Sequence, residues 1–232
     1  MTTQYPATLL RACLQAIALA LLSAPSNAHD HDFQQWTQFT AQGLVADRIV
    51  AYVEAQPRFT NNASRLGQMI LRPALGVQLT DTTQAMAGYA FIHSDMAEAS
   101  ISNEHRVWEQ LSWSIYKGDT GLTVNTRTRL EQRLVDNQDD LGWRLRQQVR
   151  AQMPLQPEGN VSGVVWVEPF YTFNKTDWGQ REGFDQVRTF LGVNFPLAKN
   201  FVAEPGYINQ TVFRDGEDRM NHVLNVSFNY RW

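Results

Sequence analysis

The sequence predicts an all-β protein, an antiparallel transmembrane β-barrel. Apolar and polar side chains alternate along many segments, short and long connections alternate along the chain, and the last segment alternates up to a terminal aromatic residue, Trp232. After the N-terminal segment no run of about 18 apolar residues exists, so the sequence excludes helical membrane spans. A barrel strand exposes only every second residue to lipid, which agrees with the low mean hydropathy.

The N-terminal segment has the features of a secretory signal peptide. Arg11 supplies a positive charge, an apolar run extends from Leu14 to Leu22, and Ser26-Asn27-Ala28 places small residues where a signal peptidase reads them. The run is too short to cross a bilayer as a helix, which takes about 20 residues. We therefore expect residues 1–28 to be cleaved off, together with Cys13, the single cysteine of the chain.

The alternation is clearest between Leu122 and Leu134. Leucine, valine and threonine occupy one face of this segment, and the polar face carries Asn125, Arg127, Arg129, Glu131 and Arg133. A helix would scatter the arginines around its axis, whereas a strand collects them on one side. The segment is therefore predicted to be a strand.

Three later segments repeat this pattern: Trp143–Met153, Val161–Asn174 and Gln186–Phe195. Gln147 interrupts the apolar face of the first segment. Pro169 lies on the apolar face of the second segment, and because proline cannot donate to a β-ladder, it predicts a bulge there.

Weaker versions of the alternation predict five further strands. These segments exceed the usual soluble strand of about 5–6 residues and match a tilted transmembrane strand of about 9–11 residues. They are Ile49–Phe59, Gly67–Leu79, Gln84–His93, Arg106–Lys117 and Phe201–Phe213.

The connections between these strands alternate in length, as they do in outer-membrane barrels with short periplasmic turns and longer extracellular loops. The short turns are Thr80–Thr83, Lys117–Thr120, Gln156–Asn160 and Ala198–Asn200. The longer loops are Thr60–Arg65, Ser94–Asn103, Asp136–Asp140, Lys175–Gly183 and Arg214–Arg219.

The last segment resembles the C-terminal targeting signal of outer-membrane proteins. Alternate residues from His222 to Trp232 are apolar or aromatic, apart from His222 itself, and the intervening residues are polar. Such a strand can pair with the outer-membrane assembly machinery and then close the barrel. We therefore expect the cell outer membrane of a Gram-negative bacterium as the location, with membrane lipids and the assembly machinery as partners.

The number of strands follows from this count. Residues 49–232 supply ten strands, which would place both ends of the barrel chain on the periplasmic side. Residues 29–48 are either a lead-in or a first strand, because Phe33–Thr40 is a further candidate that precedes a short turn at Gly43–Ala46. Since a closed antiparallel barrel needs an even number of strands, we predict ten strands, with twelve as the alternative.

The polar faces of these strands form a set rich in arginine and glutamate, which we expect to line the lumen. The structural interpretation is that these charges pair and fill a narrow barrel, because a barrel of about 8–10 strands is nearly filled by its own side chains. The functional interpretation is an anion-attracting pore. The predicted set is Glu54, Arg58, Arg72, Glu104, Arg106, Arg127, Arg129, Glu131, Arg133, Arg144, Arg146, Glu168, Arg188 and Glu204, to which the same alternation adds Arg150 and Arg231.

The sequence points to a structural barrel or a narrow pore or transport barrel rather than an enzyme. With 20 basic and 23 acidic residues the chain shows no basic stripe, so nucleic acid is excluded as a partner. The histidines at 29, 31, 93, 105 and 222 form no catalytic pairing that spacing reveals, so we predict no catalytic residues, no metal site and no cofactor. An outer-membrane lipid-modifying enzyme, of the acyl hydrolase or transferase type, is the alternative.

Spaced short motifs over most of the chain resemble a known bacterial family, the proteins of the domain of unknown function 2490. The motifs are Trp36, Leu71-Arg72-Pro73, Gly88-Tyr89, Glu104-His105-Arg106-Val107-Trp108-Glu109-Gln110-Leu111, Arg127-Thr128-Arg129-Leu130-Glu131-Gln132-Arg133, Arg144-Leu145-Arg146 and Glu204-Pro205-Gly206-Tyr207. The resemblance implies an outer-membrane barrel with no assigned activity, and it brings no catalytic residues.

Overall fold

A computed structural model describes residues 30–97, 100–156 and 159–232. The predicted signal peptide, residues 1–28, lies outside the described residues, as do residues 98–99 and 157–158 within two of the predicted connections. The described residues form eleven strands: β1 (Asp30–Ala46), β2 (Ile49–Thr60), β3 (Arg65–Thr80), β4 (Thr83–Ser94), β5 (Ser102–Lys117), β6 (Thr123–Val135), β7 (Gly142–Pro154), β8 (Ser162–Thr172), β9 (Gly183–Ala198), β10 (Phe201–Val212) and β11 (Arg219–Arg231).

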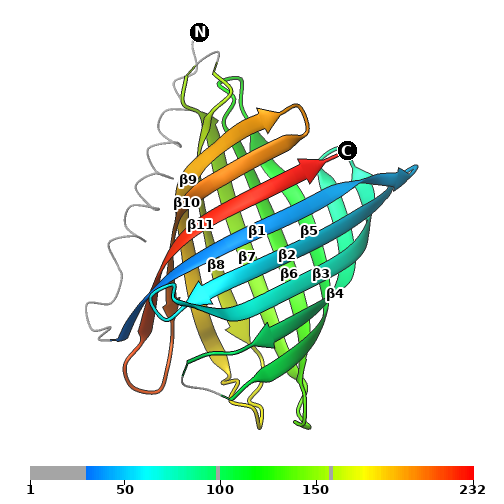
Figure 1. The fold of residues 1–232 in the computed structure, drawn as a ribbon. Coiled ribbons are helices and arrows are strands. Elements are labelled where there is room, and N and C mark those ends of the chain that lie inside the picture. Colours follow the sequence, from blue (N-terminus) through cyan, green and yellow to red (C-terminus); the bar gives the residue numbers. More distant parts are fainter. Residues whose placement is uncertain (1–29, 98–99, 157–158) are drawn as a thin grey trace.

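The strands form a closed barrel, which confirms the all-β barrel prediction (Figure 1). Each strand from β1 to β10 pairs antiparallel with the next one along the chain, and β1 pairs with β11 to close the sheet. The pairing of β1 with β11 is parallel and runs from Asp30 opposite Arg219 to Gln42 opposite Arg231.

The predicted count of ten or twelve strands is therefore wrong. The even-number rule applies when every neighbouring pair is antiparallel, because strand direction must then alternate around the whole ring. One parallel pair removes this requirement, so the described wall closes with eleven strands. Residues 30–46 are the first strand of that wall and not a lead-in.

The two ends of the described chain lie at opposite ends of the barrel, which corrects the expectation that both lie on one side (Figure 1). We call the end with the connections 47–48, 81–82, 118–122, 155–161 and 199–200 the turn end, and the other end the loop end. Trp232 follows β11 at the turn end, whereas Asp30 begins β1 at the loop end. The longest connection, residues 173–182, lies at the loop end.

The bulge expected at Pro169 is present beside it. The register between β8 and β9 shifts between Phe170 and Tyr171, directly after the proline. Pro169 itself remains opposite Val187 of β9. On the side of β7 the ladder skips Gln147 and Gln148, which agrees with the missing N–H of the proline.

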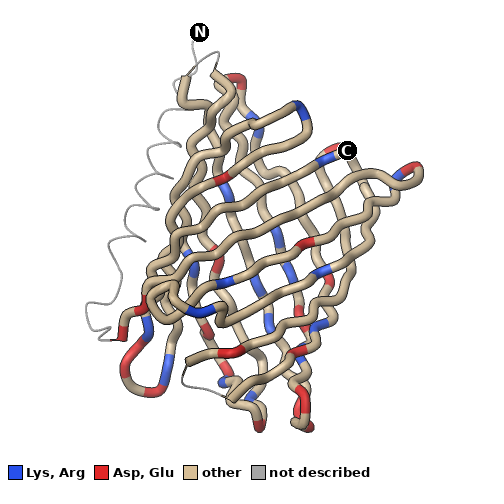
Figure 2. The backbone as a smooth tube through the Cα atoms, viewed as in Figure 1, with Lys and Arg blue, Asp and Glu red and all other residues tan. Residues whose placement is uncertain are grey.

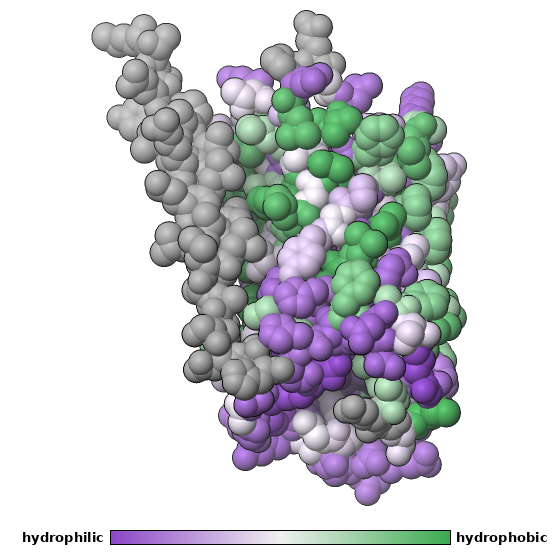
Figure 3. All heavy atoms as spheres, turned by 60° about the vertical axis from the view of Figure 1, so that its left-hand side comes forward, coloured by the Kyte–Doolittle hydropathy of each residue, from purple (hydrophilic) through white to green (hydrophobic). Residues whose placement is uncertain are grey.

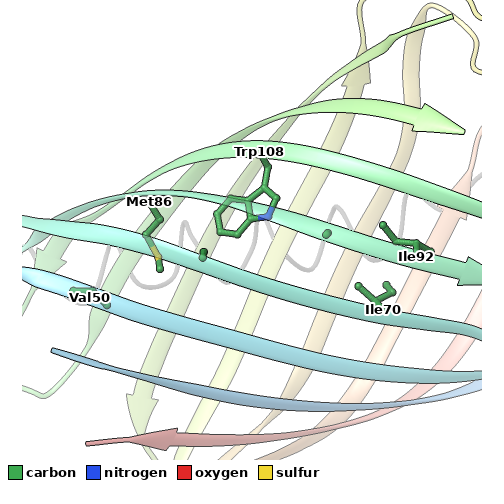
Figure 4. Packing of buried hydrophobic residues seen from close by; sticks show 7 residues of the cluster. Val50, Ile70, Met86, Ile92 and Trp108 are labelled. Atoms are coloured by element: carbon green, nitrogen blue, oxygen red, sulfur yellow. The ribbon is translucent and has the colours of Figure 1, made fainter. Parts of the chain in front are cut away.

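The interior holds two hydrophobic clusters as well as the polar faces. The first cluster comes from β2 to β5 and contains Trp108 together with Val50, Ile70, Met86 and Ile92 (Figure 4). Gly88 makes room for the indole, because a Cβ on Gly88 would lie 2.7 Å from Trp108 Cζ2. The second cluster comes from β1 and β8 to β11 and contains Trp36, Val164, Phe190, Ile208 and Val223.

The outward faces carry most of the exposed large hydrophobic residues. Leu75, Val53 and Leu191 are at least half exposed at mid-barrel, and Figure 3 shows hydrophobic residues over the upper part of one side of the barrel, with hydrophilic residues below them toward the loop end. Gln147, which interrupts the apolar face of β7, bonds to its outward neighbours: Thr128 Oγ1 donates to Gln147 Oε1 at 2.5 Å, and Gln147 Nε2 donates to Thr126 Oγ1 at 2.6 Å.

These faces predict how single cysteines will react in a Cys13→Ser background. Leu130→Cys and Val149→Cys point outward and should react with lipid-soluble thiol reagents after the protein is folded into vesicles. Arg129→Cys and Arg146→Cys point into the barrel, where the native side chains are buried, and should be protected from these reagents. Mass spectrometry of the labelled chains measures both. Labelling without alternation between neighbouring positions would contradict the register.

Candidate functional site

The barrel encloses a cavity of about 1280 Å³. Its lining residues come from both ends of the wall, with Met96 and Trp178 at the loop end and Lys199 and Tyr230 at the turn end. Charged residues recur along the strands of the wall as well as in the connections (Figure 2). The lumen is therefore the candidate functional site, and its chemistry depends on how these charges are paired.

Glu131 of β6 is the centre of the largest charge network and is 1% exposed. Arg144 donates to Glu131 Oε2 from Nη2 at 2.6 Å and from Nε at 3.0 Å, and Arg146 Nη1 donates to Glu131 Oε1 at 2.8 Å. Two more guanidinium groups, those of Arg106 and Arg129, lie 3.8 and 3.9 Å from this carboxylate. Both carboxylate oxygens of Glu131 are thereby satisfied without water.

Arg146 connects this centre to a second buried carboxylate, Glu168 of β8. Its Nη2 atom donates to both oxygens of Glu168, at 2.9 and 3.0 Å, while Arg127 Nη2 donates to Glu168 Oε1 at 2.6 Å. The network thus joins β6, β7 and β8, three neighbouring strands of the wall, through side chains on their inner faces. Sequence spacing predicts the inward face of each strand, but not this sharing of one arginine by two glutamates.

Three further glutamates have arginine partners elsewhere on the wall. Glu104 accepts from Arg106 Nε and Arg133 Nε, each at 2.6 Å. Glu54 accepts from Arg72 and from the Tyr52 hydroxyl. Glu204 accepts from Arg150 Nη1 at 2.7 Å and Nη2 at 2.5 Å, and from Asn194 at 3.2 Å.

Arg58 and Arg188 differ from the rest of the predicted set, because no described carboxylate forms an ion pair with either of them. Arg58 donates to the amide oxygens of Gln68 and Gln56, at 2.9 and 2.7 Å. Arg188 has a single long contact of 3.4 Å to Gln186, and its Nε has no partner among the described residues. Both guanidinium carbons lie over the Trp36 ring, 3.9 and 5.0 Å from its centroid.

Positive charge exceeds negative charge on the cavity lining. Among the described residues, eleven arginines and one lysine line the cavity against five carboxylates, and Glu131, which is buried against four of these arginines, adds a sixth. The lining therefore carries a surplus of positive charge, and Arg58 and Arg188 are the part of this surplus without a carboxylate.

The structure places all fourteen predicted lumen residues on the inner face, with Arg150 and Arg231. It brings eleven of the fourteen into ion pairs with one another, and a twelfth, Glu204, pairs with Arg150. Spacing missed the inward aromatic residues Trp36, Tyr52 and Trp108, and it missed Asp185, which accepts from Arg144 at 3.2 Å. The alternation does indicate an inward position for Trp108, because Trp108 follows Glu104 and Arg106 at intervals of two residues and so lies on the same face of β5. Trp36 lies on the strand that the ten-strand count left out.

A second polar group lies on the outward face near the loop end. Tyr89 hydrogen-bonds through its hydroxyl to His105 Nδ1, and His105 Nε2 lies 3.0 Å from Asp136 Oδ1. Tyr207, His222 and His31 form a similar chain on the outward faces of β10, β11 and β1, with distances of 2.6 and 3.1 Å. The described residues contain no group of three or more His, Cys, Asp or Glu side chains arranged to hold a metal ion.

Breaking the Glu131–Arg146–Glu168 bridge should destabilise the barrel. Arg146→Met leaves two buried carboxylates short of a donor, and removing one partner of a buried ion pair costs about 3–5 kcal/mol. Arg150→Met is the matched control, because Arg150 is about a quarter exposed and Glu204 keeps Asn194. Urea unfolding in vesicles measures both. Equal, small losses for the two variants would contradict a dry network around Glu131.

Comparison with known proteins identifies the family of the chain. No helix among residues 30–97, 100–156 and 159–232 is long and apolar enough to cross a membrane. The solved structure of outer-membrane expressed OmpT of Vibrio cholerae is similar with a TM-score of 0.39 and 13% identity; the match covers 72% of this chain and spans 55% of that one. An uncharacterised protein of Methylorubrum extorquens is 36% identical over 225 residues, which cover 96% of this chain and 98% of that protein. The family described as "Protein of unknown function (DUF2490)" matches residues 33–221, and the chain belongs to this family.

Proposed function

We propose that the protein is an outer-membrane β-barrel whose lumen is a narrow, anion-selective pore. The observation that carries this proposal is the surplus of arginine on the cavity lining, in particular the absence of a described carboxylate partner for Arg58 and Arg188. A lumen whose charges serve only to stabilise the barrel would need a carboxylate to neutralise each buried arginine.

The location is supported by the two surfaces of the wall. In hydrocarbon every backbone polar group needs an internal partner, and a closed sheet supplies one at every position. Exposed hydrophobic residues cover the outward faces while charges line the interior. This arrangement is the reverse of a water-soluble barrel, and together with the predicted signal peptide and the terminal strand it favours the outer membrane.

Selectivity follows from the arrangement of the charges. An anion in a confined lumen loses part of its hydration, and guanidinium groups without carboxylate partners can replace that hydration. A cation meets the same groups as a barrier. The hydrophobic clusters and the ion-paired network occupy part of the cross-section, so the proposed permeant ions are small ones such as chloride or inorganic phosphate.

A lipid-modifying enzyme is the second candidate, and one observation favours it. Tyr89, His105 and Asp136 form a hydroxyl–imidazole–carboxylate chain on the outward face near the loop end, where lipid headgroups would lie. No oxyanion-stabilising donors accompany this chain in the described contacts, and Tyr207, His222 and His31 repeat the Tyr–His contact. If the protein had this activity, its overexpression would change the composition of the membrane lipids. The His105→Gln variant would not cause this change.

The pore proposal predicts the reversal potential of single channels in planar bilayers under a KCl gradient. The native protein should favour chloride over potassium, and Arg58→Gln/Arg188→Gln should lose most of this preference. The matched control is Arg65→Gln/Lys117→Gln, which removes the same charge from residues outside the cavity lining and should leave selectivity unchanged. A native protein that conducts no ions, or that favours potassium, would contradict the proposal.

A further inference from the structure

The outward faces of β5, β6 and β7 carry a group of polar residues, which we call the β5–β7 patch: Glu109, Thr126, Thr128, Gln132 and Gln147. Glu109 lies at the middle of β5 and is exposed. Among the described residues, no other outward-facing acidic or basic side chain lies at the middle of a strand. The corresponding outward residues of β8 and β9 include Val165, Val167 and Leu191.

The patch satisfies its hydrogen bonds only in part. Gln132 Nε2 donates to Glu109 Oε2 at 3.0 Å, and the two threonines bond to Gln147. The other oxygen of Glu109 has no donor among the described residues, Gln132 Oε1 is buried without a partner, and one N–H of Gln147 is unused. The inference rests on the proposed membrane location, where a carboxylate that faces hydrocarbon is stabilised by a donor from outside the barrel.

An apolar groove of about 750 Å³ borders the patch. Small residues, Ala85 and Ala87 of β4, form its floor, because their neighbours on β3 and β5 are larger. The sides are built by Leu75 and Val77 on one strand and by Leu111 and Trp113 on the other. Glu109 and Thr128 belong both to this groove and to the patch, so one surface offers a hydrophobic recess and an unsatisfied acceptor next to each other.

We infer that this surface joins two copies of the chain in the membrane. An acyl chain can fill the groove but offers no donor to Glu109. A second copy offers both, since it carries outward apolar side chains for the groove and the amides of Gln132 and Gln147 for the carboxylate. In a twofold dimer each contact occurs twice, so the acceptor of one copy meets the donors of the other in both directions.

The test is cross-linking in lipid vesicles, with the full-length protein in a Cys13→Ser background. Leu111→Cys, on the side of the groove, should cross-link to a second copy with a short thiol reagent, and Val226→Cys on β11 should not. Adding Glu109→Leu to the Leu111→Cys variant should lower the fraction of cross-linked protein. The change corresponds to a dissociation constant of the dimer that is raised about tenfold or more. Glu109→Gln, which keeps a hydrogen-bonding group, should lower it less.

Gln35→Leu is the matched control, because it removes an outward-facing amide on β1 far from the patch and should leave the dimer unchanged. Glu109→Leu removes a charge from the outward face, so the variant should fold into vesicles at least as well as the native chain, as judged by heat-modifiable migration on gels. Its anion selectivity should match that of the native protein, which separates this inference from the pore proposal. A native chain that stays monomeric at high protein-to-lipid ratios, or a dimer undiminished by Glu109→Leu, would overturn the inference.

Discussion

Closure of the sheet is the constraint on which the rest of this structure depends. An open sheet leaves a row of N–H and C=O groups without partners at each edge, and bonding the first strand to the last removes both edges. Here the described strands number eleven, and closure therefore requires one parallel pair, β1 with β11. The ladder continues to the end of the chain, where Trp232 N donates to Gln42 O at 3.3 Å. The terminal aromatic strand thus contacts the first strand along nearly its whole length.

The interior follows from this wall. Side chains alternate along every strand, so a wall with an apolar outside delivers polar residues to a lumen too narrow to hydrate them all. Glu131 and Glu168 meet this demand by sharing Arg146, and Glu54, Glu104 and Glu204 have arginine partners of their own. Arg58 and Arg188 lie over the Trp36 ring and have no carboxylate partner among the described residues. The pore proposal rests on this difference between the paired and the unpaired arginines, which a purely structural barrel does not explain.

Much of this was predictable from the sequence, and the remainder was not, for identifiable reasons. The period-two alternation located ten strands close to their observed bounds, because neighbouring residues of a strand point to the outer and the inner face of the wall, which differ in polarity. It failed at β1 because the even-number rule presupposes antiparallel neighbours, and the parallel pairing leaves no mark on local sequence. Spacing also predicted which charges face inward. It could not predict that Arg146 bridges two glutamates or that Arg58 lacks one, because these contacts depend on the register between strands and on the conformations of long side chains.

The most direct measurement of the central claim is cross-linking along the seam between β1 and β11. In the parallel register Gln35 lies opposite Leu224, and Phe39 lies opposite Phe228, so the partner number rises with the residue number. Cysteine pairs at 35/224 and at 39/228 should both form a disulfide or a short thiol cross-link within one chain in folded protein, since directly opposed strand positions fall within disulfide reach. The contrary result is that neither pair cross-links and that cysteines on β2 cross-link directly to β11. That result would contradict the eleven-stranded barrel and favour ten strands with residues 30–46 outside the wall.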